Sequence, residues 1–267
     1  MLYCYAFDIS IQQRSTDLVK MGRALNLILS HQPARAVDKM IAWWKNCVQK
    51  DTILIAYGGT KAEFEAITHE QKVLVDDPQL RTRDHQREFQ SYTRLFRATA
   101  EFLRTHNKGF SFVHFAEYDH IPLVPDLNDR QIERMKAESA DVLAYHVHRV
   151  DGTSNPHFLY HVANPAFVSH WSRITVRSDP RVVLSMFGSG SFWTAEAFRA
   201  VVEMEEPFPM YMEIYLPTLA HHLGFRVRDL TEQNRFVRAL ASEIDPIDKA
   251  RAQGAWTLHP VKRLWDK

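Results

Sequence analysis

The sequence predicts an α/β fold in which a Rossmann-like, mostly parallel sheet is flanked by helices. Apolar, strand-like runs alternate with amphipathic, helix-like stretches, and this order implies right-handed crossovers between parallel strands. The chain has 267 residues and is 45% hydrophobic, which is enough for a substantial core. No repeat, low-complexity linker or break in composition divides it. We therefore expect a single domain over residues 1–267.

The first half opens with a strand, a helix and a second strand. The run ALNLILSHQP, from Ala24, is apolar until it ends in polar residues and proline, as a buried strand does where it enters a loop. TILIAYGG, at 52–59, is a second buried strand, closed by two glycines. Between them, residues 34–48 predict a helix, because apolar residues recur there at helical spacing: Val37, Met40, Ile41, Trp44 and Val48.

A third strand, a long helix and a fourth strand continue this alternation. KVLVDD, at 72–77, is the short third strand, and GFSFVHFAEYD, at 109–119, is the fourth. The helix between them reaches about His106, and its apolar stripe consists of Phe89, Tyr92, Leu95, Phe96, Phe102 and Leu103. Ligands of such sheets bind beyond the carboxyl ends of the strands. Glu117 and Asp119 are therefore expected at a binding edge.

The second half is less regular. A polar helix from Asp129 to Glu138 leads into a strand at 141–150, and a stretch rich in glycine, serine, asparagine and proline then interrupts the alternation. Residues 181–204 predict a strand, a glycine loop and a helix opened by Thr194. Residues 213–230 predict a helix, a glycine C-cap at Gly224 and a strand. The tail from 254 has too little periodicity for a helix.

Charge and cysteine content exclude several classes of protein. Thirty-three Lys and Arg against thirty-two Asp and Glu leave a net charge of +1, so we expect neither nucleic acid nor anionic lipid as a partner. Two cysteines cannot form a disulfide framework. The first residues lack the pattern of a signal peptide, and no stretch approaches about 18 uninterrupted apolar residues. We expect a cytoplasmic protein without a membrane span.

The acid-x-acid triplet Glu117-Tyr118-Asp119 is the strongest chemical signal. Where a strand bends into a loop, two carboxylates one residue apart can both turn toward one ion. A hard divalent cation prefers oxygen ligands and also bridges phosphate oxygens, which suits a substrate that carries a diphosphate. The sequence lacks G-x-G-x-x-G after the first strand, a P-loop lysine and a G-x-S-x-G elbow. These absences weigh against a dinucleotide dehydrogenase, a P-loop kinase and a serine hydrolase.

From about Leu25 to Lys262 the sequence resembles nucleotide-sugar-dependent glycosyltransferases of the type-A fold (GT-A), whose acid-x-acid signature follows a central strand. The resemblance implies a nucleotide-sugar donor half at about 24–125 and an acceptor half at about 126–267. Residues at the ends of the first two strands would then bind the nucleotide: Ser30, His31, Gln32, Tyr57 and Gly58. Arg83 and Arg87 would be phosphate partners, because guanidinium groups bind phosphate in bidentate geometry.

The tail sequence HPVK extends the resemblance to metal-dependent branches of this family. In those branches a C-terminal His and Lys supply a third metal ligand and a diphosphate contact, which here implies roles for His259 and Lys262. An imidazole, two carboxylates and diphosphate oxygens together form a mixed nitrogen and oxygen site for Mn2+ or Mg2+.

The stretches GSGSFWTAEAFRAVV and EIYLPTLAHHLGF are similar to the acceptor side of inverting core-2 and xylosyltransferase-like enzymes. That similarity implies that Glu213 is the catalytic base, although an acid in the first turn of a helix is also favoured by the helix dipole alone. This branch usually works without a metal, so the sequence leaves the metal requirement open. Phe192 and Trp193 are interpreted as a platform for a sugar ring, or alternatively as core residues.

The expected function is a hexosyl- or pentosyltransferase that moves a sugar from a nucleoside diphosphate, expected to be UDP, to a hydroxyl of a glycan, lipid or small molecule. The reaction is expected to be metal-assisted and inverting. A sugar nucleotidyltransferase is one alternative, but its usual glycine-rich loop with Arg and Lys is missing from SHQPARAV. A non-catalytic protein of the same fold that binds nucleotide sugars or carbohydrates is the other.

Overall fold

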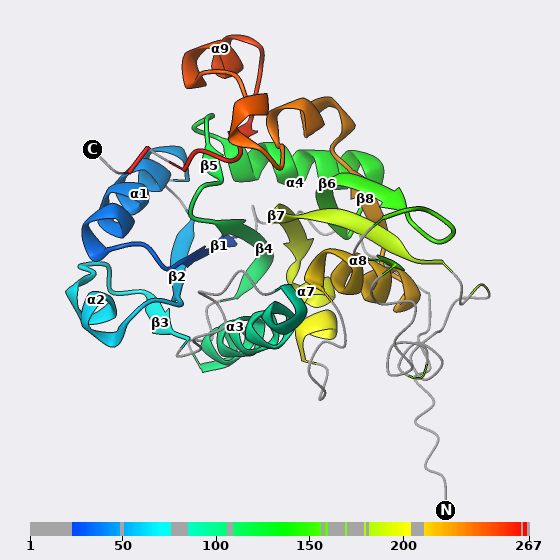
Figure 1. The fold of residues 1–267 in the computed structure, drawn as a ribbon, viewed down its shortest axis with the longest axis horizontal. Coiled ribbons are helices and arrows are strands. Elements are labelled where there is room, and N and C mark those ends of the chain that lie inside the picture. The colour runs from blue at the N-terminus through cyan, green and yellow to red at the C-terminus, as the bar shows by residue number, and fades with distance from the viewer. Residues whose placement is uncertain are drawn as a thin grey trace, which may run out of the picture.

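The computed structural model describes residues 23–48, 51–75, 85–105, 109–155, 158–159, 169, 179, 182–203, 211–262 and 264–265, with the side chains of 85–91 excepted. Its centre is a seven-stranded sheet in the order β3-β2-β1-β4-β7-β6-β8 (Figure 1). The sheet takes strands from both halves of the chain. The prediction of an α/β fold with a mostly parallel sheet between helices is confirmed.

The strands of the large sheet are β1 (Arg23–Ser30), β2 (Thr52–Tyr57), β3 (Lys72–Leu74), β4 (Phe110–Glu117), β6 (Val142–Arg149), β7 (Leu184–Thr194) and β8 (Val227–Asp229). A second, two-stranded sheet pairs β5 (Ile121–Pro122) with β9 (Thr257–Leu258). Strands β1 to β4 are parallel to one another, β7 runs antiparallel to both β4 and β6, and β8 is parallel to β6. Among the described strands of this sheet only β7 is reversed, and it follows the point at which the sequence alternation stops.

The α-helices are α1 (Ala34–Cys47), α2 (Lys61–Ala66), α3 (His85–Thr105), α4 (Leu127–Glu138), α7 (Ala195–Val202), α8 (Met212–His222) and α9 (Ile247–Ala252). Two 3-10 helices follow β8, η2 (Thr231–Phe236) and η3 (Ala241–Glu243). In the described part of the chain, no helix combines the length and hydropathy needed to cross a lipid bilayer.

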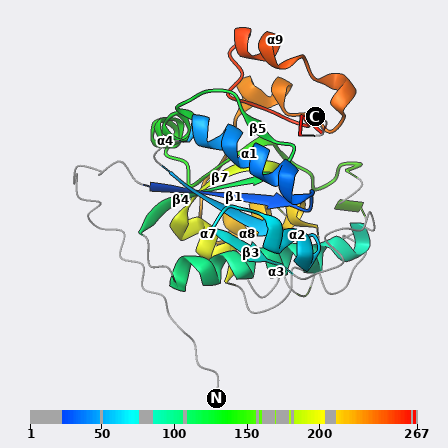
Figure 2. The same ribbon diagram turned by 90° about the vertical axis from the view of Figure 1, so that its left-hand side faces the viewer.

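Helices cover both faces of the large sheet. Figures 1 and 2 show α1 and α4 on one face and α3, α7 and α8 on the other. Strand β1 shows why: Leu27 packs in the core under α3 and α7, whereas Ile28 packs under α1, because successive side chains of a strand point to opposite faces. A strand that is buried on both faces is expected to be mostly apolar. This explains the continuous apolar runs in the sequence.

The glycine loop predicted before Thr194 is wrong, because residues 188–191 lie inside β7. The glycines there serve close packing: a Cβ at Gly188 would lie 2.3 Å from Cε of Met212. The predicted sugar platform is also wrong, because Phe192 and Trp193 are only 0% and 1% exposed and therefore belong to the core. The alternative interpretation, that Phe192 and Trp193 are core residues, is confirmed.

Candidate metal centre

The end of β4 places the two acids of the triplet on one short turn. Leu29 of β1 is the register partner of Glu117, so this turn lies at the carboxyl edge of the parallel strands. The backbone N–H of His120 donates to the carbonyl of Glu117 at 2.9 Å and closes the turn, after which β5 begins. Asp119 is 4% exposed, whereas Glu117 is half-buried. The turn therefore carries one buried and one partly accessible carboxylate.

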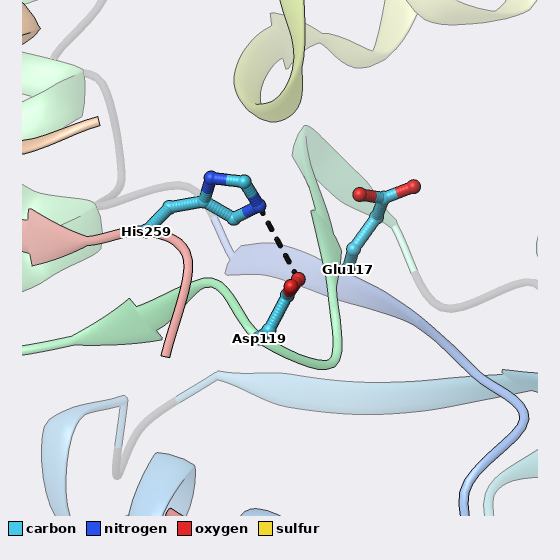
Figure 3. A group of neighbouring side chains, drawn as sticks. All are labelled: Glu117, Asp119 and His259. Carbon is cyan, nitrogen blue, oxygen red and sulfur yellow. Dashed lines mark ion pairs between the residues drawn. The ribbon is translucent and has the colours of Figure 1, made fainter. Parts of the chain in front are cut away.

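The C-terminal tail brings His259 to this turn. Strand β9 pairs with β5 through Ile121 and Leu258, and His259 follows β9 directly. The N–H of Val261 donates to the carbonyl of Asp119 at 2.8 Å, which fixes the tail against this turn. Figure 3 shows the three side chains together, with His259 approaching from the tail. Two segments that are distant in sequence thus form one cluster.

The ligand atoms of Glu117, Asp119 and His259 all lie within 4.8 Å of one another. The Nε2 atom of His259 is 3.3 Å from Oδ1 of Asp119. Its Nδ1 atom lies 2.9 Å from the carbonyl of Arg238, and because a carbonyl only accepts, Nδ1 carries the proton. In the neutral imidazole, Nε2 then presents its lone pair, as a metal-ligating histidine does.

The electrostatics of this cluster fit a cation. Burial by itself lowers the pKa of His259, but the neighbouring carboxylates of Asp119 and Glu117 outweigh it, so the pKa is raised above the usual value of imidazole. The buried Oδ1 of Asp119 has no hydrogen-bond donor in the described part of the chain; it has only the 3.3 Å contact with Nε2 of His259. Two carboxylates and one imidazole around a common point are a suitable donor set for a divalent cation.

Glu213 lies beside this cluster, in the first turn of α8. Its Oε1 atom accepts a hydrogen bond of 3.0 Å from the N–H of Gly188, and the side chain is half-buried. The next residue of β7, Ser189, accepts a hydrogen bond of 2.9 Å from the N–H of Glu117. Adjacent residues of one strand therefore contact Glu213 and Glu117. The structure brings the predicted base and the acid triplet into the same region.

The five residues predicted to bind the nucleotide lie together at the carboxyl ends of β1 and β2. The Oγ of Ser30 accepts from the N–H of Gln32 at 3.2 Å, and its carbonyl accepts from the N–H of Gly58 at 2.9 Å. The hydroxyl of Tyr57 donates to the carbonyl of Gln32 at 2.9 Å. The exposed His31 completes the group. Nucleotide binding by these residues remains a prediction.

His31 also connects this group to the acid triplet. Its ring packs edge-on against Tyr118, the middle residue of the triplet, at a centroid distance of 5.1 Å. The carbonyl of Tyr118 accepts a hydrogen bond of 3.0 Å from the indole of Trp265. The loop after β1, the turn after β4 and the tail are therefore in contact at one edge of the sheet.

Of the three residues predicted to contact the phosphates, only one has a described side chain. Arg83 lies outside the described residues, and Arg87 lies in α3, where its side chain is not described. Lys262 is exposed and follows Val261, whose backbone contacts Asp119. Of these three residues, only the backbone of Lys262 is placed beside the candidate metal centre in the described part of the chain.

Sequence reasoning missed two neighbours of the centre. The ring of His120 is fully buried, 5.7 Å from that of His259, and burial, with the charges of His259 and His114, holds the pKa of His120 well below its usual value. The motif EYDH contains it, so its position next to Asp119 was a usable signal. The hydroxyl of Tyr92 donates to Oε1 of Glu117 at 2.9 Å. Nothing in the sequence indicates that contact, because folding alone brings α3 to the triplet.

A cavity of about 690 Å³ lies elsewhere, between the end of α1 and the start of β2. Its lining includes Lys45, Asp51 and His69. It lies at the amino ends of the strands, so it is not part of the metal centre.

No protein-family model matches the chain, and no curated protein matches its sequence. Similar solved structures include a mannosyltransferase, PcManGT from Pyrobaculum calidifontis, in complex with GDP-Man and Mn2+, at a TM-score of 0.43 and 13% identity over 79% of this chain and 55% of that one. The bifunctional glycosyltransferase WbbM matches with a TM-score of 0.44 and 9% sequence identity, and the match covers 91% of this chain and 46% of that one. A glycosyltransferase involved in glycosylation of the major capsid of PBCV-1 matches with a TM-score of 0.43 and 11% sequence identity, and the match covers 89% of this chain and 94% of that one.

Three glycosyltransferases are thus among the similar structures. This is the class of protein that the sequence resembles. The chain spans about half the length of the first two, 55% and 46%. At this level, the similarity assigns no residue and no activity to the chain.

Proposed function

We propose that the protein is a glycosyltransferase that moves a sugar from a nucleoside-diphosphate sugar to an acceptor hydroxyl. The observation that carries the proposal is the convergence of Glu117, Asp119 and His259 within 4.8 Å at the carboxyl edge of the sheet. In open α/β sheets, ligands bind at this edge. The residues predicted to bind a nucleotide lie at the same edge.

Glu117, Asp119 and His259 would hold Mn2+ or Mg2+ through two carboxylates and one imidazole nitrogen. The buried Oδ1 of Asp119 supports this assignment, since a buried carboxylate oxygen requires a partner. A bound divalent cation neutralises the negative charge that develops on the departing diphosphate.

The donor would be held from several sides by the chain itself. The ends of β1 and β2 would bind the nucleotide through Ser30, His31, Gln32, Tyr57 and Gly58, and we expect uridine as its base. Lys262 would contact the diphosphate from the tail, with Arg83 and Arg87 as further phosphate partners. Cationic side chains stabilise the leaving group as the bond to the sugar breaks.

Glu213 would act as the catalytic base of an inverting transfer. Its carboxylate takes the proton of the acceptor hydroxyl while that oxygen attacks the anomeric carbon and the bond from this carbon to the diphosphate oxygen breaks. The attack comes from the face opposite the diphosphate, so the configuration at the anomeric carbon inverts. The hydrogen bond from the N–H of Gly188 orients the carboxylate of Glu213.

The test is to incubate the purified protein with a panel of nucleotide sugars, with and without Mn2+, and to measure the released nucleotide. We expect metal-dependent release with one donor, and loss of release in Asp119→Asn. Release without a divalent cation would overturn the metal centre. Formation of pyrophosphate from a nucleoside triphosphate and a sugar phosphate would show a nucleotidyltransferase instead. Binding of a nucleotide sugar without turnover would show a non-catalytic protein.

A further inference from the structure

Glu117 is the most exposed of the three proposed cation ligands. Asp119 and His259 are only 4% and 6% exposed, whereas Glu117 is half-buried. A glutamate also has one more side-chain torsion than an aspartate, and holding such a side chain in one rotamer costs conformational entropy. A cation site that includes Glu117 therefore needs neighbours that fix this side chain.

Tyr92 of α3 contacts the carboxylate of Glu117 directly. Its hydroxyl donates to Oε1 at 2.9 Å, and the residue is 8% exposed. The tyrosine ring is held by two further rings: Phe96 is stacked on it at a centroid distance of 6.3 Å, and Tyr211 meets it edge-on at 6.4 Å. Because the ring is packed on two sides, the position of its hydroxyl is set by the core.

Ser189 of β7 fixes the backbone of the same residue. Its Oγ accepts from the N–H of Glu117 at 2.9 Å, and it is 2% exposed. Glu117 is the last residue of β4, and the register of β4 with β7 runs only from Phe112 to Phe115. The pairing of β4 with β7 ends before Glu117, and there the hydroxyl of Ser189, instead of a backbone carbonyl of β7, accepts the hydrogen bond from the N–H of Glu117.

We propose that Tyr92 and Ser189 are positioning residues that hold Glu117 in the geometry of a cation ligand. The inference rests on the proposed function, because it needs the cation site. Partners that hydrogen-bond a ligating carboxylate fix its orientation, and their loss typically weakens metal affinity about 10- to 100-fold. We expect a loss in this range for Tyr92→Phe, which keeps the packed ring, and a loss of similar direction for Ser189→Ala.

The experiment uses Mn2+ alone as the probe. The full chain is titrated with Mn2+, and free Mn2+ is followed by electron paramagnetic resonance for the parent, Tyr92→Phe and Ser189→Ala. Thr99→Val is the matched control, because it also removes a buried hydroxyl from α3 but loses only a bond to the carbonyl of Leu95 in its own helix. Thermal melts of all four proteins report stability separately.

Weaker Mn2+ binding in both test variants, with parental binding in Thr99→Val, supports the proposal. Affinity within threefold of the parent overturns the role of the residue concerned, even if its melting temperature falls, because that result shows a structural role only. An equal loss in Thr99→Val overturns specific positioning. If the parent itself does not bind Mn2+, the cation site of the proposed function fails, and the inference fails with it.

Discussion

At Gly190 the backbone has a φ of +90°, which L side chains rarely adopt. An added Cβ would also lie 2.2 Å from Cε1 of His120 and 2.7 Å from Cε2 of Tyr145. Both of these rings are fully buried, so neither can move aside into solvent. A side chain at this position would therefore strain the backbone and displace one of these two rings.

We predict that Gly190→Ala lowers the free energy of unfolding by at least about 3 kcal/mol, since overpacking adds to the strain of a positive φ. Urea denaturation measures this loss. Gly152→Ala is the control, because Gly152 has a φ of +78° but open space around its Cβ position. It should lose only about 1–2 kcal/mol, the cost of the left-handed backbone conformation alone. Equal losses would contradict the steric argument.

Glu213 gives a second prediction at the scale of one residue. Glu213→Gln keeps an oxygen that can accept from Gly188 but cannot take a proton, so turnover should fall by about 10²- to 10⁴-fold. Mn2+ affinity should stay near that of the parent. Steady-state rates with the donor found in the panel provide the measurement.

The matched control for Glu213→Gln is Glu196→Gln. Glu196 is an exposed acid in the first turn of α7 and has the same relation to its helix dipole. It should retain the parental rate. Parental turnover in Glu213→Gln would show that Glu213 is only a favourable acid at a helix N-terminus.

At the scale of single elements, the sequence predicted what local signals determine. Thr194 was expected to open a helix, and its side chain accepts from the N–H of Ala197. Gly224 was expected as a C-cap, and it has a φ of +95° after α8. Strands β5 and β9 have two residues each, too few for a pattern, and α2 has no buried residue and therefore no apolar stripe. Such elements exist because of the surrounding fold.

The caps allow a prediction about elements. Thr194→Ala removes the N-cap of α7, a helix with five buried residues, and should lower the free energy of unfolding by about 1 kcal/mol. Thr60→Ala removes the same kind of cap from α2, which has no buried residue and packs against the core only through the partly buried Phe64. Its effect on global unfolding should be smaller. Urea denaturation of both variants decides the order, and a larger loss in Thr60→Ala would contradict it.

For the whole molecule, the sequence indicated the sheet but not every neighbour of the site. The order of apolar runs predicted the parallel strands, and the family resemblance predicted that Glu117, Asp119 and His259 share a centre. The reversed strand β7 was read as containing a loop, because its glycines are turn residues in most contexts. Tyr92 and Ser189 reach Glu117 only through tertiary packing. A single sequence carries no signal for such contacts.

Stability should depend on pH through a buried imidazole. Burial lowers the pKa of His114 from 6.5 to about 3. Below pH 6.5 the unfolded chain therefore binds a proton that the folded protein does not, so stability is full above this pH and falls as the pH drops toward 3. At pH 5 the cost from this group is about 2 kcal/mol, from roughly 1.5 pKa units at 1.36 kcal/mol each.

His114→Leu should reduce this acid sensitivity. Urea denaturation of the parent and the variant between pH 7 and pH 5 measures the slope of unfolding free energy against pH. The variant should lose less stability over this range, even if the cavity left by the smaller side chain lowers its stability at pH 7. Parallel slopes would show that His114 takes up its proton in the folded state.

The pairing of β5 with β9 would give a bound cation a role in holding the C-terminal tail in place. Glu117 and Asp119 lie in the middle of the chain and His259 near its end, so an ion bound by all three would link the turn after β4 to the tail after β9. Detachment of the last strand would release the ion, and the ion in turn would slow that detachment. Amide exchange along residues 257–262 should therefore read out occupancy of the centre without any substrate.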